Sequence, residues 1–309
     1  MEARAFSPGH ITTFFVPRGD SSAPPLNRGS LGSGFCIESG VTSVAKAEGP
    51  SRAGGGRPTA LPFKLSVADN GVRVAHPETT TGALQELVRR APRGTRLPET
   101  LALENAYTLP LGAGFGVSGA CALAGALAAN QAMQLGLGRA DCVAAAHVGE
   151  VLALTGLGDV GAQSLGGFEM RTREGPPPAG EVLRPAAPIS PVVLVSFGPR
   201  PTRAFLTDPR GKERLAAAGI DCLRELTAAP SLEKSVRLGR RFAETLGLVS
   251  ARAEGLLRAL DPVAPASVAM LGDSVFAVGG EAAAVIARRI APRAFVETTS
   301  LTLSGARLL

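Results

Sequence analysis

The chain has little of what marks nucleic-acid-binding, zinc-binding or disulfide-rich proteins. Its 309 residues contain no tryptophan and one tyrosine, Tyr107. Aromatic side chains that could stack on single-stranded nucleic acid are therefore scarce. The four cysteines lie far apart and form no CxxC pair, so the spacing suggests neither a zinc site nor a disulfide framework. These absences are typical of a protein kept in a reducing cytoplasm.

Long apolar runs are also missing. The longest, residues 120–135, is mostly alanine and includes Asn130, Gln131 and Gln134. Such a run is too short and too polar to cross a membrane. The N-terminus lacks the basic and apolar regions of a signal peptide. We therefore expect a soluble, cytoplasmic protein that does not associate with membranes.

Lysine is rare, although the formal net charge is +6. Only four of the 32 basic residues are lysines, at positions 46, 64, 212 and 234, and the rest are arginines. These cations are dispersed and form no run of the kind that binds nucleic acid. A positive balance still attracts anionic small molecules. The charge therefore favours a small phosphorylated or carboxylated ligand over a nucleic acid.

Strand-like and helix-like segments are mixed without a regular strand–helix–strand repeat, which favours an α+β fold over a doubly wound sheet. Six prolines between residues 174 and 191 interrupt regular structure and predict a domain junction. We expect an N-terminal domain at 1–175 and a C-terminal domain at 176–309. Turns are predicted at 7–10, around Asn70-Gly71 and over the Gly-rich stretch 49–58, and a loop is predicted at 155–164. Helices are predicted at 78–90, 119–135, 139–154, 209–218, 231–246, 251–259 and 281–290.

The most informative segment is a glycine-rich loop between a predicted strand, 100–107, and an alanine-rich helix. Gly112, Gly114 and Gly116 alternate strictly, so the backbone can reach positive φ and approach a ligand closely. The free N–H groups and the dipole at the start of the following helix favour phosphate. The loop lacks the Lys-Ser/Thr of a Walker A motif and differs from a Rossmann fingerprint. A tightly packed helix start is the structural alternative.

Polar residues in and beyond this helix supply candidate metal and catalytic groups. Ser118 could bind Mg²⁺ or could cap the helix, and its sequence position leaves both open. His147 and Glu150 lie three residues apart and share one face of an apolar helix. A carboxylate there is costly to bury without a partner, which a metal ion would supply. Asp159 follows in a Gly-rich segment.

Three features together resemble the GHMP kinases, a superfamily of ATP-dependent small-molecule kinases. They are Pro8-Gly9, the loop 110–120 (PLGAGFGVSGA), and Glu150 followed by Gly158-Asp159. The resemblance implies the GHMP kinase fold, with two mixed α/β subdomains and an active site in the cleft between them. The superfamily's third glycine-rich motif is poorly matched around Gly272, which weakens any role for Gly272 or Ser274 at the nucleotide.

Within the superfamily, four segments are most similar to the archaeal pantoate kinases: residues 7–12, 30–34, 158–167 and 305–309. This similarity implies phosphorylation of the primary hydroxyl of (R)-pantoate in coenzyme A biosynthesis, with ATP and Mg²⁺ as cofactors. Kinases of homoserine, shikimate or mevalonate, and a non-catalytic ligand-binding relative, are the alternatives. The oligomer that the resemblance suggests is a homodimer.

The resemblance also implies a role for each candidate residue. Asp159 is the base that orients or deprotonates the attacking hydroxyl. Ser118 and Glu150 hold Mg²⁺, and Arg171 clamps the substrate carboxylate. The ATP phosphates are bound by Pro110, Gly112, Ala113, Gly114, Gly116, Ser118 and Gly119. Further substrate contacts are expected from His147, Ser30, Thr202 and His10.

Overall fold

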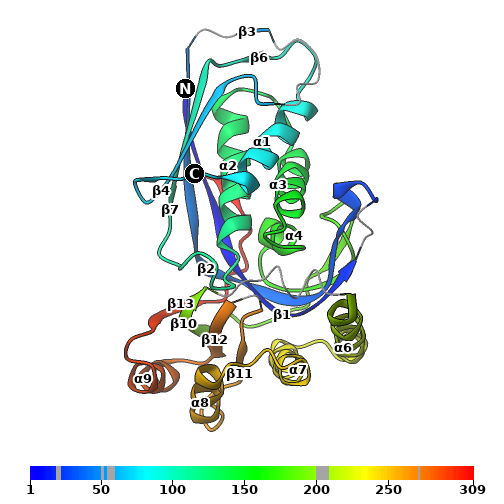
Figure 1. Ribbon diagram of the computed structural model, residues 1–309, viewed down its shortest axis with the longest axis vertical. Helices are drawn as coiled ribbons and strands as arrows, with labels where there is room; N and C mark the ends of the chain where they lie inside the picture. Colours follow the sequence, from blue (N-terminus) through cyan, green and yellow to red (C-terminus); the bar gives the residue numbers. More distant parts are fainter. Residues whose placement is uncertain (19–21, 50–51, 54–59, 200–208, 271) are drawn as a thin grey trace.

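The computed structural model describes residues 1–18, 22–49, 52–53, 60–199, 209–270 and 272–309. The chain folds into two main β-sheets with helices packed against them (Figure 1). The strands are β1 (Glu2–Arg18), β2 (Gly29–Glu48), β3 (Arg52–Ala53), β4 (Lys64–Asp69), β5 (Val72–Arg73), β6 (Arg96–Leu97), β7 (Thr100–Ala106), β8 (Phe168–Arg173), β9 (Glu181–Leu183), β10 (Pro191–Pro199), β11 (Ala266–Val268), β12 (Gly272–Val278), β13 (Phe295–Ser300) and β14 (Arg307–Leu308). The helices are α1 (Glu78–Arg90), α2 (Val117–Ala132), α3 (Arg139–Ala153), α4 (Asp159–Leu165), α6 (Pro209–Ala228), α7 (Leu232–Thr245), α8 (Ala251–Leu260) and α9 (Glu281–Ile290), with a short 3₁₀ turn, η1, at Pro25–Asn27.

A long antiparallel hairpin of β1 and β2 organises the larger sheet. The strand order is β14-β1-β2-β7-β4-β5, and β8 pairs with β2 and with β9. The later half of β2 pairs with β7, whereas its earlier half, around Gly34, pairs with β8. Helices α1 to α4 lie along one face of this sheet (Figure 1). Helix α2 packs directly on β1 and β2 and is apolar on nearly all sides, as expected for a helix enclosed in a core.

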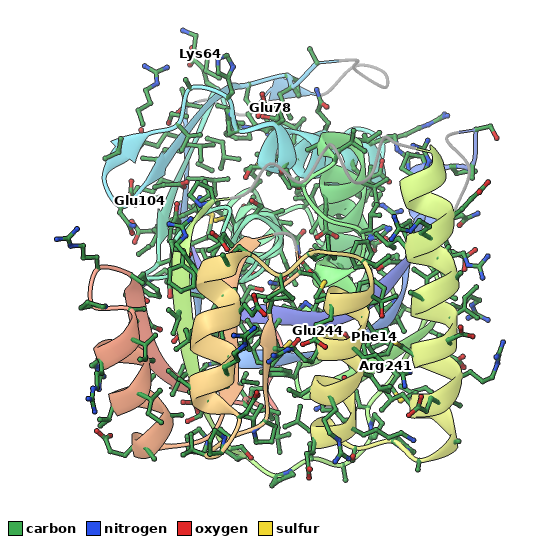
Figure 2. All side chains as sticks on the ribbon, turned by 60° about the horizontal axis from the view of Figure 1, so that its bottom comes forward. Phe14, Lys64, Glu78, Glu104, Arg241 and Glu244 are labelled. Carbon is green, nitrogen blue, oxygen red and sulfur yellow. The ribbon has the colours of Figure 1, made fainter. Side chains whose placement is uncertain are left out.

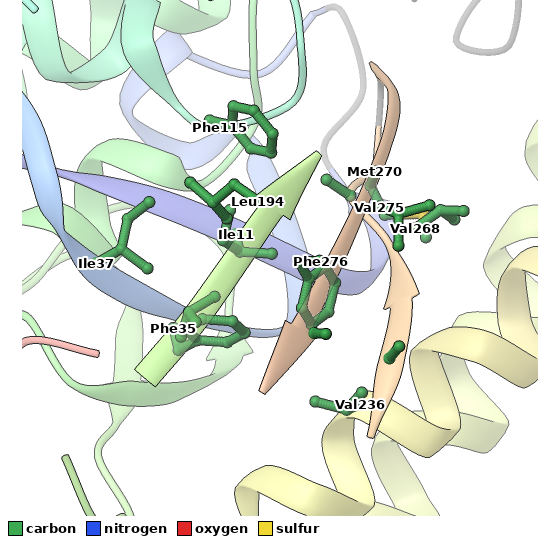
Figure 3. Close-up of a cluster of buried hydrophobic side chains, with 14 of the residues drawn as sticks. Ile11, Phe35, Ile37, Phe115, Leu194, Val236, Val268, Met270, Val275 and Phe276 are labelled. Atoms are coloured by element: carbon green, nitrogen blue, oxygen red, sulfur yellow. The ribbon is translucent and has the colours of Figure 1, made fainter. Parts of the chain in front are cut away.

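The smaller sheet, ordered β11-β12-β10-β13, continues the same hydrophobic core. Figure 3 shows Ile11 and Phe35 of the long hairpin beside Leu194 of β10 and Phe276 of β12. The rings of Phe35 and Phe276 meet edge to face, with their centroids 5.4 Å apart. The two sheets are therefore joined by shared apolar packing as well as by the chain itself.

Helices α6 and α7 pack against the end of β1 through close backbone approaches. A Cβ atom on Gly219 of α6 would lie 2.6 Å from the carbonyl oxygen of Phe15, so only glycine permits this contact. Phe242 of α7 packs its ring 6.4 Å from that of Phe14. Figure 2 shows Phe14 beside α7, the helix that also carries Arg241 and Glu244.

Most predicted elements are confirmed, including the Asn70-Gly71 turn and the bounds of α1 and α9. The turn predicted at 7–10 is wrong, because β1 runs through it with a register shift between Pro8 and Gly9. A β-bulge of this kind accommodates a proline inside a strand. Residues 50–51 and 54–58 of the predicted loop at 49–58 lie outside the described residues, and residues 52–53 form the short strand β3. Helix α6 extends beyond the predicted 209–218, and the domain boundary after residue 175 stays a prediction.

The loop predicted at 155–164 is also wrong in its second half. Helix α4 begins at Asp159 and ends at Leu165, after the turn that contains Gly156 and Gly158. No helix in the part of the chain that the structure describes is long and apolar enough to span a bilayer.

Candidate active site

The glycine-rich loop has the backbone geometry expected of a phosphate cradle. Gly112, Gly114 and Gly116 have φ angles of 77°, 83° and 70°, in the left-handed region that glycine adopts without strain. Gly116 is the N-cap of α2, and no side chain caps this helix. Ser118 is therefore not the cap that the sequence left possible. The N–H groups of the first helical turn are available to an anion.

The loop is held from two sides. Gln163 of α4 donates a hydrogen bond of 2.8 Å from Nε2 to the carbonyl of Gly116. On the other side, a Cβ on Gly114 would lie 2.6 Å from the carbonyl oxygen of Met270. A Cβ on Gly272 would lie only 2.0 Å from the carbonyl oxygen of Ala113. The poorly matching third motif thus packs against the loop itself through Gly272.

Ser274 of the same motif has a different place. Its side chain is fully buried, and its hydroxyl donates a 3.0 Å hydrogen bond to that of Ser196 on β10. Ser274 stabilises the smaller sheet and does not line the cavity beside the loop.

Glu150 lies behind Gly119 and Gly156, two glycines that line this cavity. Its carboxylate fits between two glycines, because a Cβ would lie 3.2 Å from Oε1 if placed on Gly119 and 2.4 Å if placed on Gly156. The side chain is 1% exposed, and Oε2 has no hydrogen-bond partner among the described residues. Burial, reinforced by the charge of Asp159, raises the pKa of Glu150 well above its usual value. A cation would remove this cost of burial.

Asp159 is the first residue of α4 and keeps 23% of its side chain exposed to the cavity. Its Oδ1 lies 2.8 Å from His10 Nδ1 and accepts a 3.3 Å hydrogen bond from the Thr12 hydroxyl. Burial alone would raise the pKa of Asp159. The hydrogen bond and charge of His10, together with the charge of Arg171 and the hydrogen bond from Thr12, outweigh burial and lower the pKa from its usual value. Asp159 is therefore an ionised acceptor that faces the cavity.

His10 does not have the place that the sequence suggested. The ring is fully buried, with Nδ1 at Asp159 and Nε2 lying 3.1 Å from Glu169 Oε1. Both ring nitrogens are occupied, so neither is free to contact a substrate. Burial lowers the pKa of His10, but the two carboxylates more than compensate and raise it overall.

Arg171, the predicted carboxylate clamp, and Ser30, a predicted substrate contact, both lie next to Gly158. A Cβ on Gly158 would lie 2.8 Å from both Arg171 Nε and Ser30 Oγ. The Arg171 NH1 group donates to Glu169, while its Nε has no partner within the described parts of the chain. Ser30 and Gly158 line the cavity that also contains the phosphate loop.

His147 lies deeper. Its Nε2 donates a 2.8 Å hydrogen bond to the carbonyl of Arg28, and burial lowers its pKa to about 4, which keeps the ring neutral. Its Nδ1 is 3.9 Å from Glu150 Oε2, beyond hydrogen-bond distance. His147 therefore anchors the start of β2 beneath the cavity. Thr202 lies outside the described residues.

One cavity collects the phosphate loop, Ser30, Asp159 and the 155–158 turn, together with Thr12 and Met270. Sequence reasoning missed Thr12, Gln163 and Glu169. For Glu169 a signal existed, because it lies two residues from Arg171 on one strand and so projects from the same face.

Comparison with known proteins defines the class first. The family model described as the GHMP kinases N terminal domain matches residues 78–167, which carry the phosphate loop, Glu150 and Asp159. The fold is therefore that of the GHMP kinases, a class of small-molecule kinases. A homoserine kinase structure from Cytophaga hutchinsonii shares this fold at 17% identity, with a TM-score of 0.69 and coverage of 100% of this chain and 97% of that one.

Closer relatives specify the family. Pantoate kinase of Thermococcus kodakarensis is 34% identical over 282 residues, covering 90% of this chain and 88% of the relative. Pantoate kinase of Methanocaldococcus jannaschii is 30% identical and covers 88% of this chain and 91% of its own. A solved structure titled "Phosphotransferase related to CoA biosynthesis pathway" has a TM-score of 0.81 at 29% identity, with coverage of 100% and 99%. The chain belongs to the pantoate kinase family.

Proposed function

We propose that the chain transfers the γ-phosphoryl group of ATP to the primary hydroxyl of (R)-pantoate, as a step of coenzyme A biosynthesis. The observation that carries this proposal is the convergence of Asp159, the phosphate loop and Ser30 on one cavity, with Arg171 next to Gly158 in its wall. A hydroxy acid bound there can place its carboxylate at Arg171 and a hydroxyl at Asp159. The names of the curated relatives support the choice of pantoate.

Phosphoryl transfer needs positioning and charge neutralisation more than covalent help from the protein. The backbone of residues 112–119 would bind the phosphates through N–H groups and the dipole of α2. Asp159 Oδ would accept the proton of the substrate hydroxyl, whose oxygen then attacks the γ-phosphorus. The bond from this phosphorus to the bridging oxygen breaks, and ADP leaves with that electron pair.

The residues beside the loop fit Mg²⁺. No cluster of three His, Cys, Asp or Glu side chains among the described residues could hold a metal alone. Glu150 nevertheless offers a buried, unpartnered Oε2 behind Gly119, and the neighbouring Ser118 lines the cavity. Mg²⁺ is commonly bound by one or two carboxylates together with substrate phosphates and water. We propose that Glu150 and Ser118 hold Mg²⁺, which when bound neutralises phosphate charge.

Substrate selection rests on Arg171 in this proposal. A guanidinium binds a carboxylate through two parallel hydrogen bonds, and the buried Arg171 Nε, which has no partner among the described residues, would donate one of them. Ser30 would contact a substrate hydroxyl from the same side. Thr202 stays a candidate contact, whereas His147 would act by anchoring β2. The predicted homodimer, the cytoplasmic location and the absence of nucleic-acid binding stay predictions.

The test is an assay of ADP release with ATP and Mg²⁺ against pantoate, homoserine, shikimate, mevalonate and pantothenate. Product on pantoate alone supports the proposal. Turnover of a different alcohol on the panel would show that the chain is a kinase but that pantoate is not its substrate. Turnover of none, with ATP still bound, would favour a ligand-binding relative without catalysis.

A further inference from the structure

A buried chain of alternating charges runs behind the cavity from Arg171 to Asp159. Glu169 of β8 is its centre, with a fully buried side chain. Its Oε1 accepts from Arg171 NH1 and also lies 3.1 Å from His10 Nε2. His10 Nδ1 then lies 2.8 Å from Asp159 Oδ1. Three elements, β1, β8 and α4, contribute to this chain.

The geometry determines where the protons lie. Both ring nitrogens of His10 face carboxylate oxygens, and a histidine can donate at both positions only as an imidazolium. From Arg171 through Glu169 and His10 to Asp159, positive and negative charges therefore alternate in space. Buried charges are tolerated when each is paired in this way. Glu169 is the member that touches both cations.

The backbone of β2 next to His10 leaves just enough room for the imidazole ring. Gly34 lies opposite Glu169 in the register of β2 and β8. A Cβ at Gly34 would lie 2.6 Å from His10 Nε2, so the absence of a side chain there admits the imidazole ring. The ring cannot move toward β2, and its orientation depends on its two carboxylate partners.

We propose that Glu169 is a positioning residue that couples the substrate clamp to the catalytic base. It is too deeply buried to touch a substrate and acts through its neighbours. Through Arg171 it orients the guanidinium so that Nε faces Ser30 and Gly158. Through His10 it holds the carboxylate of Asp159 at the cavity. This inference rests on the proposed function for the roles of Arg171 and Asp159.

Two variants separate the two arms of the coupling. Glu169→Gln keeps the size of the side chain but removes its charge. We expect it to lower kcat by about 10- to 100-fold, the scale of a misplaced catalytic group, and to raise the KM for pantoate. His10→Gln breaks only the arm to Asp159, so it should lower kcat and leave the KM for pantoate within about 2-fold. In both variants the KM for ATP should stay within about 3-fold.

The matched control is Glu181→Gln, which removes a carboxylate from the neighbouring strand β9, where Glu181 accepts from the exposed Thr172 hydroxyl. It should leave kcat and both KM values unchanged. A merely structural role for Glu169 would instead lower the melting temperature and change the KM for ATP as well. That pattern, or unchanged kcat in E169Q, overturns the inference.

If E169Q does not fold, the kinetics of H10Q alone test the coupling. A fall in kcat with an unchanged KM for pantoate supports the coupling, and an unchanged kcat refutes it. Failure of the proposed function is a separate result, because it appears in the wild-type chain as absence of turnover on pantoate. The three variants would then be compared on whichever panel substrate the wild type turns over. Should it turn over none, the coupling of a clamp to a catalytic base is refuted as well.

Discussion

Asp159 lines the cavity and Glu150 is buried behind its wall, and their surroundings shift the pKa values of these two carboxylates in opposite directions. Burial without a partner for Oε2 raises the pKa of Glu150, whereas His10, Arg171 and Thr12 together outweigh burial and lower the pKa of Asp159. Such divergence is typical of sites in which two acids have different tasks. Glu150 gains most from a cation, and Asp159 is ready to accept a hydrogen bond from a hydroxyl.

Asp159→Asn tests the base directly. The amide keeps an oxygen for His10 and Thr12 but cannot take a proton, so we expect kcat to fall by about 10²- to 10⁴-fold. The affinity for a non-hydrolysable ATP analogue, measured by calorimetry, should change less than about 3-fold. Asp141→Asn, at a carboxylate of α3 that pairs with Arg90, is the control and should retain activity. Near-normal turnover in D159N would contradict the assignment.

Arg171→Ala tests the clamp. Loss of a charge-assisted pair should raise the KM for pantoate by about 10- to 100-fold, because such bonds contribute about 1.5–3 kcal/mol. The KM for ATP should change far less. Arg173→Ala removes an exposed arginine from the same strand, whose guanidinium donates to backbone carbonyls at Ala179 and Gly180. Steady-state kinetics that show equal effects on both substrates in R171A would exclude the clamp.

At the scale of elements, the local sequence pattern was sufficient to predict a helix or turn whose conformation does not depend on pairing with distant segments. The amphipathic helix α1 and the Asn-Gly turn follow from spacing and turn chemistry, and both were predicted from the sequence. The strand through Pro8 and Gly9 was not, because pairing with β2 keeps β1 extended across residues that favour turns. Helix α4 was missed because its seven residues include a glycine and begin directly after Gly158.

In the candidate site, too, some features could be predicted from the sequence and others could not. The sequence was sufficient to select Ser30, Asp159 and Arg171, which the structure brings to one region. The contact between His10 and Glu169 was out of reach, since it joins residues 159 positions apart through the register of β1, β2 and β8. Pattern identifies the residue types a reaction needs, while register decides which of them meet.

Gly116→Ala tests the phosphate loop as an element. An alanine at φ 70° is strained by about 1–2 kcal/mol, and its Cβ would lie 2.9 Å from Gln163 Nε2 and 3.0 Å from His10 Cβ. We expect the KM for ATP to rise by about 10-fold or more. Gly136→Ala is a matched control, because its φ is 69° and nothing lies within 4 Å of the added Cβ. It should lower the melting temperature by backbone strain and leave the KM for ATP unchanged.

At the scale of the whole molecule, the β1–β2 hairpin connects the helices that bear the site with the smaller sheet and its helices (Figure 1). Phe14 and Phe15 of β1 pack against Phe242 of α7, with ring centroids 6.4 and 6.1 Å apart. Phe15 also lines the cavity, along with Thr12 from the same strand. The same strand, β1, therefore packs against α7 and lines the candidate active site.

Phe242→Ala tests whether the molecule unfolds as one cooperative unit. Truncating a buried phenylalanine costs about 3–5 kcal/mol, and the shared strand should spread this loss through both sheets. The chain has one tyrosine and no tryptophan, so its fluorescence reports the surroundings of Tyr107, which lies just before the phosphate loop and packs against the core that the two sheets share. Circular dichroism reports the helices packed on the larger sheet and those packed on the smaller sheet.

In a urea titration of F242A, we expect both signals to shift together to a lower midpoint. Phe6→Ala, at a half-buried ring near the start of β1 that packs under Arg307, is the control and should shift the midpoint less. A Tyr107 transition that stays at the wild-type midpoint while the dichroism transition moves would show that the two parts unfold independently. In that case the hairpin would connect the parts without making them one cooperative structure.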